Sequence, residues 1–370
     1  MKIEEFQLER IQSLYENTVE LNLSESGVHP MSLRDLLSDD ELAELHALEL
    51  GYGWTNGAIA LRETIAGQYD NHGPDNVIVT NGSAEANFLV TMSLLEAGDE
   101  LIVFTPNYLQ IWGLARALGV TTKTVSHDPQ RNWQPDIKQL KSLITANTQL
   151  ITVCHPNNPT GSVLSHSQMQ ALVEVAADNN IYLHADEVYK GSELEGTESA
   201  SFRDMYENTI VTNGLSKAMA LPGLRIGWLA GPAEKIYAAW QRKDYSSITT
   251  SALSEYVAAK VLQPALRQKI LSRSKAILRE NLSVLKNWVD NNADFVSLIP
   301  PKAGGMAFVR YLFSANSTEL VHALRKEKGV LLIPGDVYGL DGFFRVGIGS
   351  PREHLEPGLG RISDYFRSNY

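Results

Sequence analysis

Short apolar segments of strand length alternate with amphipathic segments of helix length from about residue 76 onward. The apolar segments comprise residues 76–80, 100–104, 149–154, 181–185 and 209–212. Helical patterns near residues 84–95, 109–118, 135–144 and 166–179 separate several of them. This alternation predicts a mostly parallel sheet covered by helices on both faces. Ligands of such sheets bind at the carboxyl ends of the strands, so functional residues are expected there.

The composition argues against several kinds of partner. The 370 residues carry a formal net charge of -11, which disfavours binding to a nucleic acid backbone. No apolar run reaches the length of a membrane span. The acidic start, with Glu4, Glu5, Glu9 and Glu16, is unlike a signal peptide, so we expect a cytoplasmic protein. Cys154 is the only cysteine, which excludes an intrachain disulfide and a cysteine metal cluster, and no metal site is expected.

Two polar turns follow the first two predicted strands. Ser83 is expected to cap the helix that begins near Ala84, and Gly82 lets the backbone approach a ligand closely. The free amides at this helix start would suit an anion such as phosphate, although a simple helix cap explains them equally well. Tyr108 follows the next strand and either lies against a flat ligand or packs under its own loop.

Lys217 and Arg225 follow the strand at residues 209–212. A lysine kept away from water can lose its proton and act as a nucleophile. A nearby arginine can bind a phosphate. These are the requirements of a Schiff base with pyridoxal phosphate. Taken alone, the pair fits equally well a solvated loop lysine and an arginine in a structural ion pair.

Two further motifs follow buried strands. Asn158 lies between prolines in the stretch from His155 to Gly161, a stiff turn that aims its side chains and would let the amide reach a phenolic oxygen. Asp186 ends another strand, where a carboxylate is costly unless a cation such as a protonated pyridine nitrogen lies beside it. Tyr189 follows and could bond the same phenolic oxygen. A capping role for Asp186 or its neighbour Glu187 is the alternative.

Together these motifs resemble the class I and II aminotransferases of pyridoxal phosphate fold type I, from about Leu21 to the C-terminus. The resemblance rests on Tyr52 with Gly57 and Leu61-Arg62, Asn81-Gly82-Ser83, Pro106-Asn107-Tyr108, Asn157 to Gly161, Asp186 to Tyr189, Ser216-Lys217, Gly223 to Trp228, and Phe344-Arg345. It implies an α/β protein with a large domain, whose mostly parallel seven-stranded sheet lies between helices, and a smaller α+β domain. The implied divisions are an N-terminal arm with part of the small domain (1–45), the large cofactor-binding domain (46–280) and the small domain (281–370).

The resemblance also implies a role for each matching residue. Lys217 holds pyridoxal phosphate as an aldimine and later moves the proton of the substrate α carbon. Asp186 meets the pyridine nitrogen, Asn158 and Tyr189 meet the ring oxygen, and Tyr108 stacks on the ring. The phosphate is bound by Arg225 with residues of two turns, namely Gly82, Ser83, Ala84 and Ser216. Tyr52 reaches the phosphate of a neighbouring subunit, so a homodimer with the active site at the subunit interface is implied.

The substrate residues are less closely defined. Arg345 is expected to bind the α-carboxylate of an amino acid, with Asn158 nearby. The stretch from Ser24 to Pro30 borders the pocket in the family, which places Gly27, Glu25 and His29 near the substrate. A carboxylate at Glu25 would attract a cationic side chain, such as that of arginine; a surface glutamate and a turn histidine are the alternative. This stretch also resembles that of capreomycidine-synthase-like and arginine-oxidising members of the fold.

The remaining segments give simpler expectations. An amphipathic arm at residues 3–21 and a helix at 32–49 precede the sheet pattern. The small domain is predicted to contain strands at 296–299, 307–311, 330–333 and 343–348, with helices at 317–328 and after Pro351. Gly214 stands where many relatives carry a serine that binds phosphate, which removes one hydroxyl from the phosphate site.

Three functions are compatible with these features. The first is an aminotransferase that moves an amino group from an L-amino acid to a 2-oxo acid. The second is a pyridoxal phosphate-dependent lyase, cyclase or oxidase that acts on a basic amino acid such as arginine or a derivative. The third is a ligand-sensing module of a transcription regulator, which the absence of a basic helix-turn-helix segment before Leu21 and a pI of about 5.4 disfavour.

Overall fold

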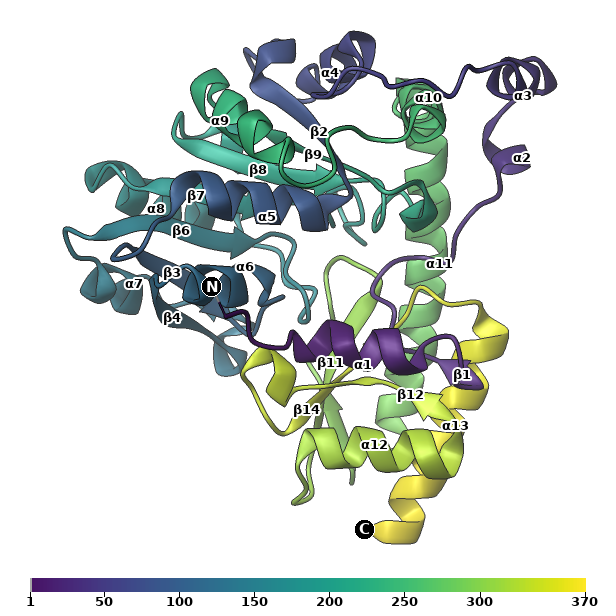
Figure 1. The fold of residues 1–370 in the computed structure, drawn as a ribbon. Coiled ribbons are helices and arrows are strands. Elements are labelled where there is room, and N and C mark those ends of the chain that lie inside the picture. The colour runs from purple at the N-terminus through teal and green to yellow at the C-terminus, as the bar shows by residue number, and fades with distance from the viewer. Residues whose placement is uncertain (1) are drawn as a thin grey trace.

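The computed structural model describes residues 2–370, and its large sheet contains eight strands (Figure 1). In spatial order they are β2 (Val77–Asn81), β9 (Ile226–Ala230), β8 (Thr209–Gly214), β7 (Tyr182–Asp186), β6 (Thr148–Cys154), β3 (Glu100–Thr105), β4 (Thr121–Asp128) and β5 (Gln134–Pro135). The five strands from β8 to β4 run parallel, and β9 is antiparallel to both of its neighbours. The mostly parallel sheet is therefore confirmed, and the two-residue β5 adds an eighth strand to the expected seven.

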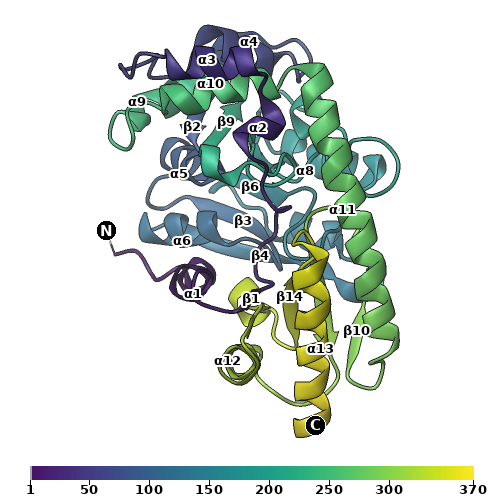
Figure 2. The same cartoon turned by 90° about the vertical axis from the view of Figure 1, so that its right-hand side faces the viewer.

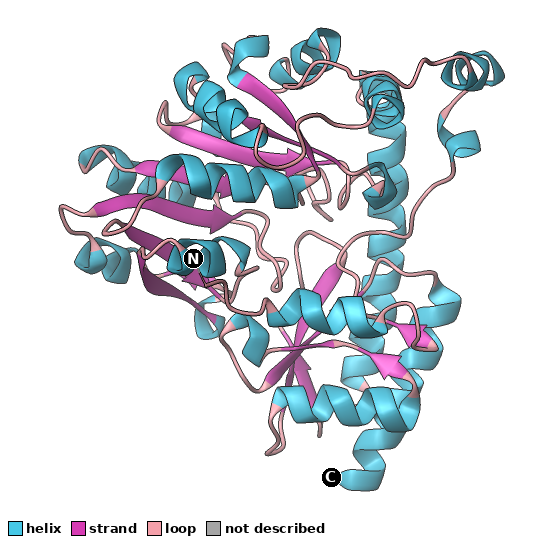
Figure 3. Cartoon of the chain, in the orientation of Figure 1, coloured by secondary structure: helices cyan, strands magenta, loops and turns pink. Residues whose placement is uncertain are grey.

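Helices cover both faces of this sheet (Figure 3). One core contains residues of α5 (Ser83–Leu94), α6 (Gln110–Ala117) and α9 (Ala233–Lys243). The other contains residues of α4 (Ile59–Ala66), α7 (Ile137–Leu143), α8 (His166–Asp178) and α10 (Ala252–Val261). Successive residues of β3 alternate between the two cores, with Leu101 and Val103 in the first and Ile102 and Phe104 in the second. Burial on both faces explains why the strands read as continuous apolar runs. Strand β4 is missing from the predicted strands because its sequence TTKTVSHD is mostly polar.

The second sheet is antiparallel and smaller. Its order is β10 (Val296–Leu298), β11 (Met306–Tyr311), β14 (Phe343–Gly347) and β13 (Ile333–Pro334), and it packs with α12 (Ser317–Lys328) and α13 (Arg352–Asn369). The single strand predicted at 330–333 is wrong. The chain there forms β12 (Val330–Leu331), which pairs in parallel with β1 (Leu21–Asn22), and then crosses to β14 as β13.

The N-terminal region is less helical than its pattern predicts. Helix α1 (Gln7–Tyr15) occupies the middle of the expected arm. The single helix expected at 32–49 is wrong, because the chain forms α2 (Leu33–Leu36) and α3 (Asp39–His46). Leu37 between them is extended, with φ -115° and ψ 145°. The Ser38 side chain accepts a hydrogen bond from the amide of Glu41 and so caps α3 as a new helix.

Helix α11 (Pro264–Asp290) runs alongside both sheets (Figure 2). Its residues Ile270 and Leu271 pack into the core of the large sheet, whereas Leu278 and Leu285 pack into the core of the small one. The predicted division between residues 280 and 281 falls inside this continuous helix. No helix in the described part of the chain is both long and apolar enough to cross a membrane.

Candidate active site

A cavity of about 410 Å³ lies at the ends of β6, β7 and β8, with α1 and β14 completing its wall. Most of the predicted site residues line it, namely Glu25, Ser83, Ala84, Tyr108, Asn158, Asp186, Tyr189, Ser216, Lys217, Arg225 and Arg345. A larger cavity of about 700 Å³, beside the small sheet, contains none of the predicted residues. The cavity therefore brings together residues from seven of the motifs described above, together with Glu25.

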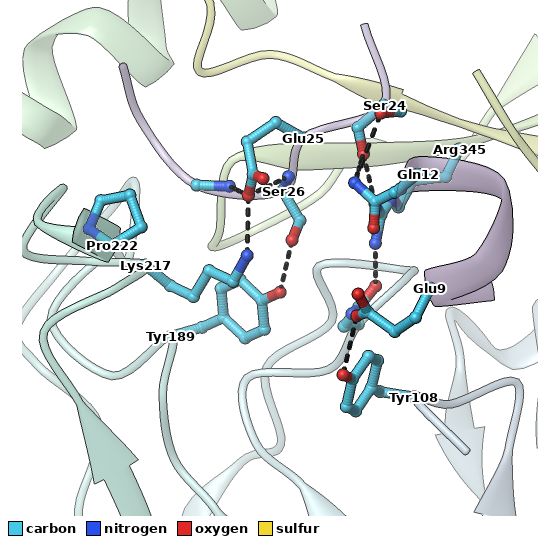
Figure 4. Close-up of polar contacts among 12 residues, drawn as sticks. Glu9, Gln12, Ser24, Glu25, Ser26, Tyr108, Tyr189, Lys217, Pro222 and Arg345 are labelled. Carbon is cyan, nitrogen blue, oxygen red and sulfur yellow. Dashed lines mark hydrogen bonds and ion pairs between the residues drawn. The ribbon is translucent and has the colours of Figure 1, made fainter. Parts of the chain in front are cut away.

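Lys217 and Glu25 form an ion pair at the centre of the cavity (Figure 4). Lys217 follows β8, and its Nζ lies 2.7 Å from Glu25 Oε1. The same carboxylate oxygen accepts hydrogen bonds from the amides of Ser26 (2.8 Å) and Gly27 (2.9 Å). Burial would raise the pKa of Glu25, but the charge and hydrogen bond of Lys217, with smaller contributions from Arg345 and the Gly27 amide, lower it to about 2. Glu25 is thus an ionised partner of the lysine itself.

Asp186 is a buried carboxylate at the last position of β7. It accepts hydrogen bonds from Asn87 Nδ2 (3.2 Å) and from the amide of Val188 (3.2 Å). Burial raises the pKa of Asp186 from 3.8 to about 6, although these donors and the charge of Lys217 oppose that rise. It forms no ion pair with any residue from 2 to 370. The site therefore holds a carboxylate that lacks a close cation.

Asn87 is a site residue that sequence reasoning missed. It lies on α5, is 2% exposed, lines the cavity, and also contacts Gln110 Oε1 at 3.3 Å. The available signal was an asparagine on the buried face of a helix, among Ala86, Leu89, Val90 and Thr91. Its amide donates to Oδ2 of Asp186, whereas the Val188 amide donates to Oδ1.

The start of α5 meets the loop before β9 at very short range. Gly82, with φ 78°, is the N-cap and Ser83 is the first helical residue, so the expected capping by the Ser83 side chain is wrong. A Cβ atom at Gly82 would lie 2.4 Å from Arg225 Nη2, and one at Gly227 would lie 2.5 Å from Ser83 N. Glycine at both positions lets the exposed guanidinium of Arg225 lie against the free amides of the helix start. A guanidinium beside free helix amides is an arrangement that can bind an anion.

Gly214 has a steric reason for lacking a side chain. It pairs with Gly227 across β8 and β9, and a Cβ atom there would lie 2.9 Å from Ile226 O. A serine at this position would require the two strands to separate. The hydroxyl missing from the predicted phosphate site is therefore excluded by the local packing of this chain.

Arg345 is almost fully buried on β14, with 1% of its surface exposed. Its Nη1 donates to Asn158 Oδ1 at 3.0 Å, and its Nη2 donates to the carbonyl of Ser24. Its Nε has no partner among the described residues. Tyr189 OH donates to Ser26 Oγ at 2.8 Å, so Asn158 and Tyr189 both line the cavity while bonded to neighbouring protein groups.

Helix α1 closes one side of the cavity, which sequence reasoning also missed. Glu9, Gln12 and Glu16 line it. Tyr108 OH donates to Glu9 Oε1 at 2.8 Å, and Gln12 Nε2 donates to Ser24 Oγ at 3.3 Å (Figure 4). Burial and the negative charge of Glu9 raise the pKa of Tyr108 well above its ordinary value, so its hydroxyl stays protonated. The amphipathic pattern of α1 was the available signal, since these three residues share its polar face.

Four predicted residues do not line this cavity. His29 has its Nδ1 3.1 Å from the carbonyl of Gly349 and lies in a segment without regular secondary structure. Gly27 contributes its amide to Glu25, and Gly82 contacts Arg225. Tyr52 is 88% exposed and lies in the loop before α4.

Comparison with known proteins shows the family and the fold of this chain. Residues 33–362 match the aminotransferase class I and II family. Capreomycidine synthase of Streptomyces vinaceus is 29% identical over 348 residues, which cover 93% of this chain and 89% of that protein. The crystal structure of a PLP-dependent aminotransferase from Streptococcus suis superposes with a TM-score of 0.93 and 31% identity over 100% of this chain and 99% of that one. The PLP-dependent cyclase OrfR superposes with a TM-score of 0.91 and 27% identity over 100% and 99% of the two chains.

Proposed function

Since this chain belongs to the aminotransferase class I and II family and is therefore a pyridoxal phosphate-dependent enzyme, we propose that it transfers the amino group of an L-amino acid to a 2-oxo acid. The observation that carries this proposal is the convergence of Lys217, Asp186, Arg225 and Arg345 on one cavity. These residues offer an amine, a carboxylate for a ring nitrogen, a cation for a phosphate and a cation for a carboxylate.

The cavity fits the cofactor on two structural grounds. The buried Asp186 carboxylate has no close cation, and a protonated pyridine nitrogen would supply one. The glycine-lined start of α5, with Arg225 against it, would bind the phosphate. We assign the covalent attachment of the cofactor to Lys217 and the contact with its ring nitrogen to Asp186. Asn158 and Tyr189 would contact the ring oxygen, and Tyr108 would contact the ring face. The phosphate would be bound by Gly82, Ser83, Ala84, Ser216 and Arg225.

Four side chains of the cavity have separate roles in the proposed reaction. Bound pyridoxal phosphate supplies the electron sink for the electrons of the substrate α carbon. Once a substrate amino group has released it from the cofactor, the Lys217 amine would take the proton of the substrate α carbon as a general base. Glu25, 2.7 Å from Nζ, holds this amine in place. Asp186 keeps a proton on the ring nitrogen by its negative charge, and the Arg345 guanidinium binds the α-carboxylate.

A half-reaction experiment tests the proposal. The wild-type holoenzyme is expected to convert its cofactor stoichiometrically to pyridoxamine phosphate with an amino acid alone, and a 2-oxo acid is expected to reverse the change. Lys217→Ala should abolish both changes, while Lys138→Ala, on the exposed side of α7, should abolish neither. Turnover that survives Lys217→Ala would refute the assignment of the catalytic amine.

We also propose a homodimer in which Tyr52 completes the phosphate site of the partner. Tyr52 is 88% exposed and lies outside the cavity of its own chain, and Leu50 and Trp54 beside it are 78% and 64% exposed. Such exposed apolar side chains are typical of an interface. Mixing the inactive Lys217→Ala protein with a weakly active Tyr52→Ala protein should restore activity, because one site of each mixed dimer is intact. Additive activities after mixing would contradict the shared site.

A second candidate is a lyase, cyclase or oxidase acting on a basic amino acid. It is supported by the Glu25 carboxylate at the reacting amine and by the similarity to capreomycidine synthase and to the cyclase OrfR. Both functions begin with removal of the α proton. Release of ammonia or consumption of oxygen from a basic amino acid without any 2-oxo acid would favour this candidate, whereas a strict requirement for a 2-oxo acid would favour amino transfer.

A further inference from the structure

We propose that α1 selects a substrate with a cationic side chain, a guanidinium or an ammonium group, through the carboxylates of Glu16 and Glu9. The proposal rests on the proposed amino acid chemistry of the cavity. It goes beyond that chemistry by naming the side-chain charge and the two residues that recognise it.

Helix α1 is a fixed wall of the cavity. Its apolar residues Leu8 and Ile11 pack into a core with Phe308, Leu331, Ile333 and Tyr338 of the small-domain region. Its polar residues Glu9 and Gln12 line the cavity, as does Glu16, which directly follows its last residue. The hydrogen bonds from Tyr108 to Glu9 and from Gln12 to Ser24 attach the helix on both sides of the opening. The carboxylates are therefore held where a bound ligand would meet them.

The carboxylate of Glu16 lacks a matching positive charge. It has no ion pair with a described residue. Burial raises the pKa of Glu16, and the negative charges of Glu25 and Glu9 raise it further, so the three carboxylates lie close enough to repel one another. Lys217 opposes this rise, but its Nζ is already paired with Glu25 and is the amine that attaches the cofactor. In the loaded enzyme the wall formed by α1 is left with excess negative charge.

Arg345 provides independent evidence for a ligand in the same cavity. Its side chain is 1% exposed and lines the cavity, yet it forms no ion pair with any residue from 2 to 370. A buried guanidinium without a paired anion is costly, and a carboxylate in the cavity would supply the missing charge. The α-carboxylate of the substrate is thus assigned to Arg345, and the α-amino group to the region of Lys217. The side chain of the substrate would then face the carboxylates of Glu9 and Glu16, which favour a positive charge on that side chain.

The test compares arginine with citrulline, which has nearly the same shape but a neutral urea group. Holoenzyme is titrated with each amino acid, and the dissociation constant is read from the change in the cofactor spectrum. The wild type is expected to bind L-arginine or L-lysine at least about tenfold more tightly than L-citrulline or L-norleucine. Glu16→Gln should weaken arginine binding about tenfold and leave citrulline binding unchanged.

Two further variants separate charge from structure. Glu16→Asp keeps the charge and should retain part of the preference for arginine. Glu5→Gln, on the exposed part of the same arm and outside this cavity, should leave both dissociation constants unchanged. Thermal unfolding of each holoenzyme shows whether a variant is folded.

The possible outcomes distinguish this inference from the proposed function. Equal binding of arginine and citrulline by the wild type, or equal weakening of both by Glu16→Gln, would overturn the inference while neutral amino acids could still support amino transfer. A spectrum that no amino acid changes would refute the proposed function and this inference together. Preference for arginine with ammonia release would support the inference and the second candidate function.

Discussion

The buried carboxylate of Asp186 should make the cofactor-free protein less stable as the pH rises. Burial raises the pKa of Asp186 from 3.8 to about 6. Between these two values the unfolded chain releases the proton while the folded protein retains it, so the free energy of unfolding falls with rising pH. A difference of this size corresponds to about 3 kcal/mol, lost in full above pH 6 or so.

The Asp186→Asn variant isolates this contribution. Its apoprotein should lose less stability than the wild-type apoprotein between about pH 4 and 7, so that the difference between the two grows toward about 3 kcal/mol. Urea unfolding at a series of pH values measures both curves. Glu187 also contributes to each curve, because burial raises its pKa from 4.5 to about 7. This residue is present in both proteins, so its contribution cancels in the difference.

Asp40→Asn is the control variant, because it removes one carboxylate from the exposed side of α3 instead of a buried one. The wild-type holoenzyme should lose less stability over the same pH range than the apoprotein, because a pyridine cation would compensate the ionised Asp186. Parallel curves for the wild-type and Asp186→Asn apoproteins would show that ionising Asp186 costs nothing in the fold, and the reasoning would fail.

Three further variants test other parts of the site. Gly227→Ala places a Cβ atom 2.5 Å from Ser83 N and should weaken cofactor binding about tenfold in absorbance titrations; Gly223→Ala, whose Cβ would meet nothing within 4 Å, is the control. Arg345→Lys should raise KM for amino acids about tenfold with an unchanged cofactor spectrum. Glu25→Gln should lower kcat/KM about tenfold for neutral and basic amino acids alike, because Glu25 contacts Lys217; a loss confined to basic amino acids would contradict this.

Much of the large sheet could be predicted because its strands are buried on both faces. Apolar runs such as residues 100–104 carry this information locally, and the polar residues at their ends show where a ligand binds. Strand β4 lacks the signal, since its sequence is mostly polar. The break at Leu37 was missed because the cap formed by Ser38 competes with a helical pattern that continues through it.

The contacts within the site could be predicted only in part. The positions of Lys217 and Asp186 at one cavity follow from the order of the strands, whereas that of Arg345 was implied by the family resemblance alone. The pairing of Lys217 with Glu25 joins residues 192 positions apart, and that of Tyr189 with Ser26 joins residues 163 positions apart. No local pattern encodes such contacts, which depend on how the N-terminal segment crosses the ends of the strands.

The charges of the cavity show why cofactor and substrate should both stabilise the fold. Its cations are Lys217, Arg225 and Arg345, and its carboxylates are Glu9, Glu16, Glu25 and Asp186. A cofactor would bring a phosphate for Arg225 and a ring cation for Asp186. A basic amino acid would bring a carboxylate for Arg345 and a cation for the carboxylates of Glu9 and Glu16. Each ligand would therefore complement charges of the cavity residues, and binding of each should raise the free energy of unfolding by mass action.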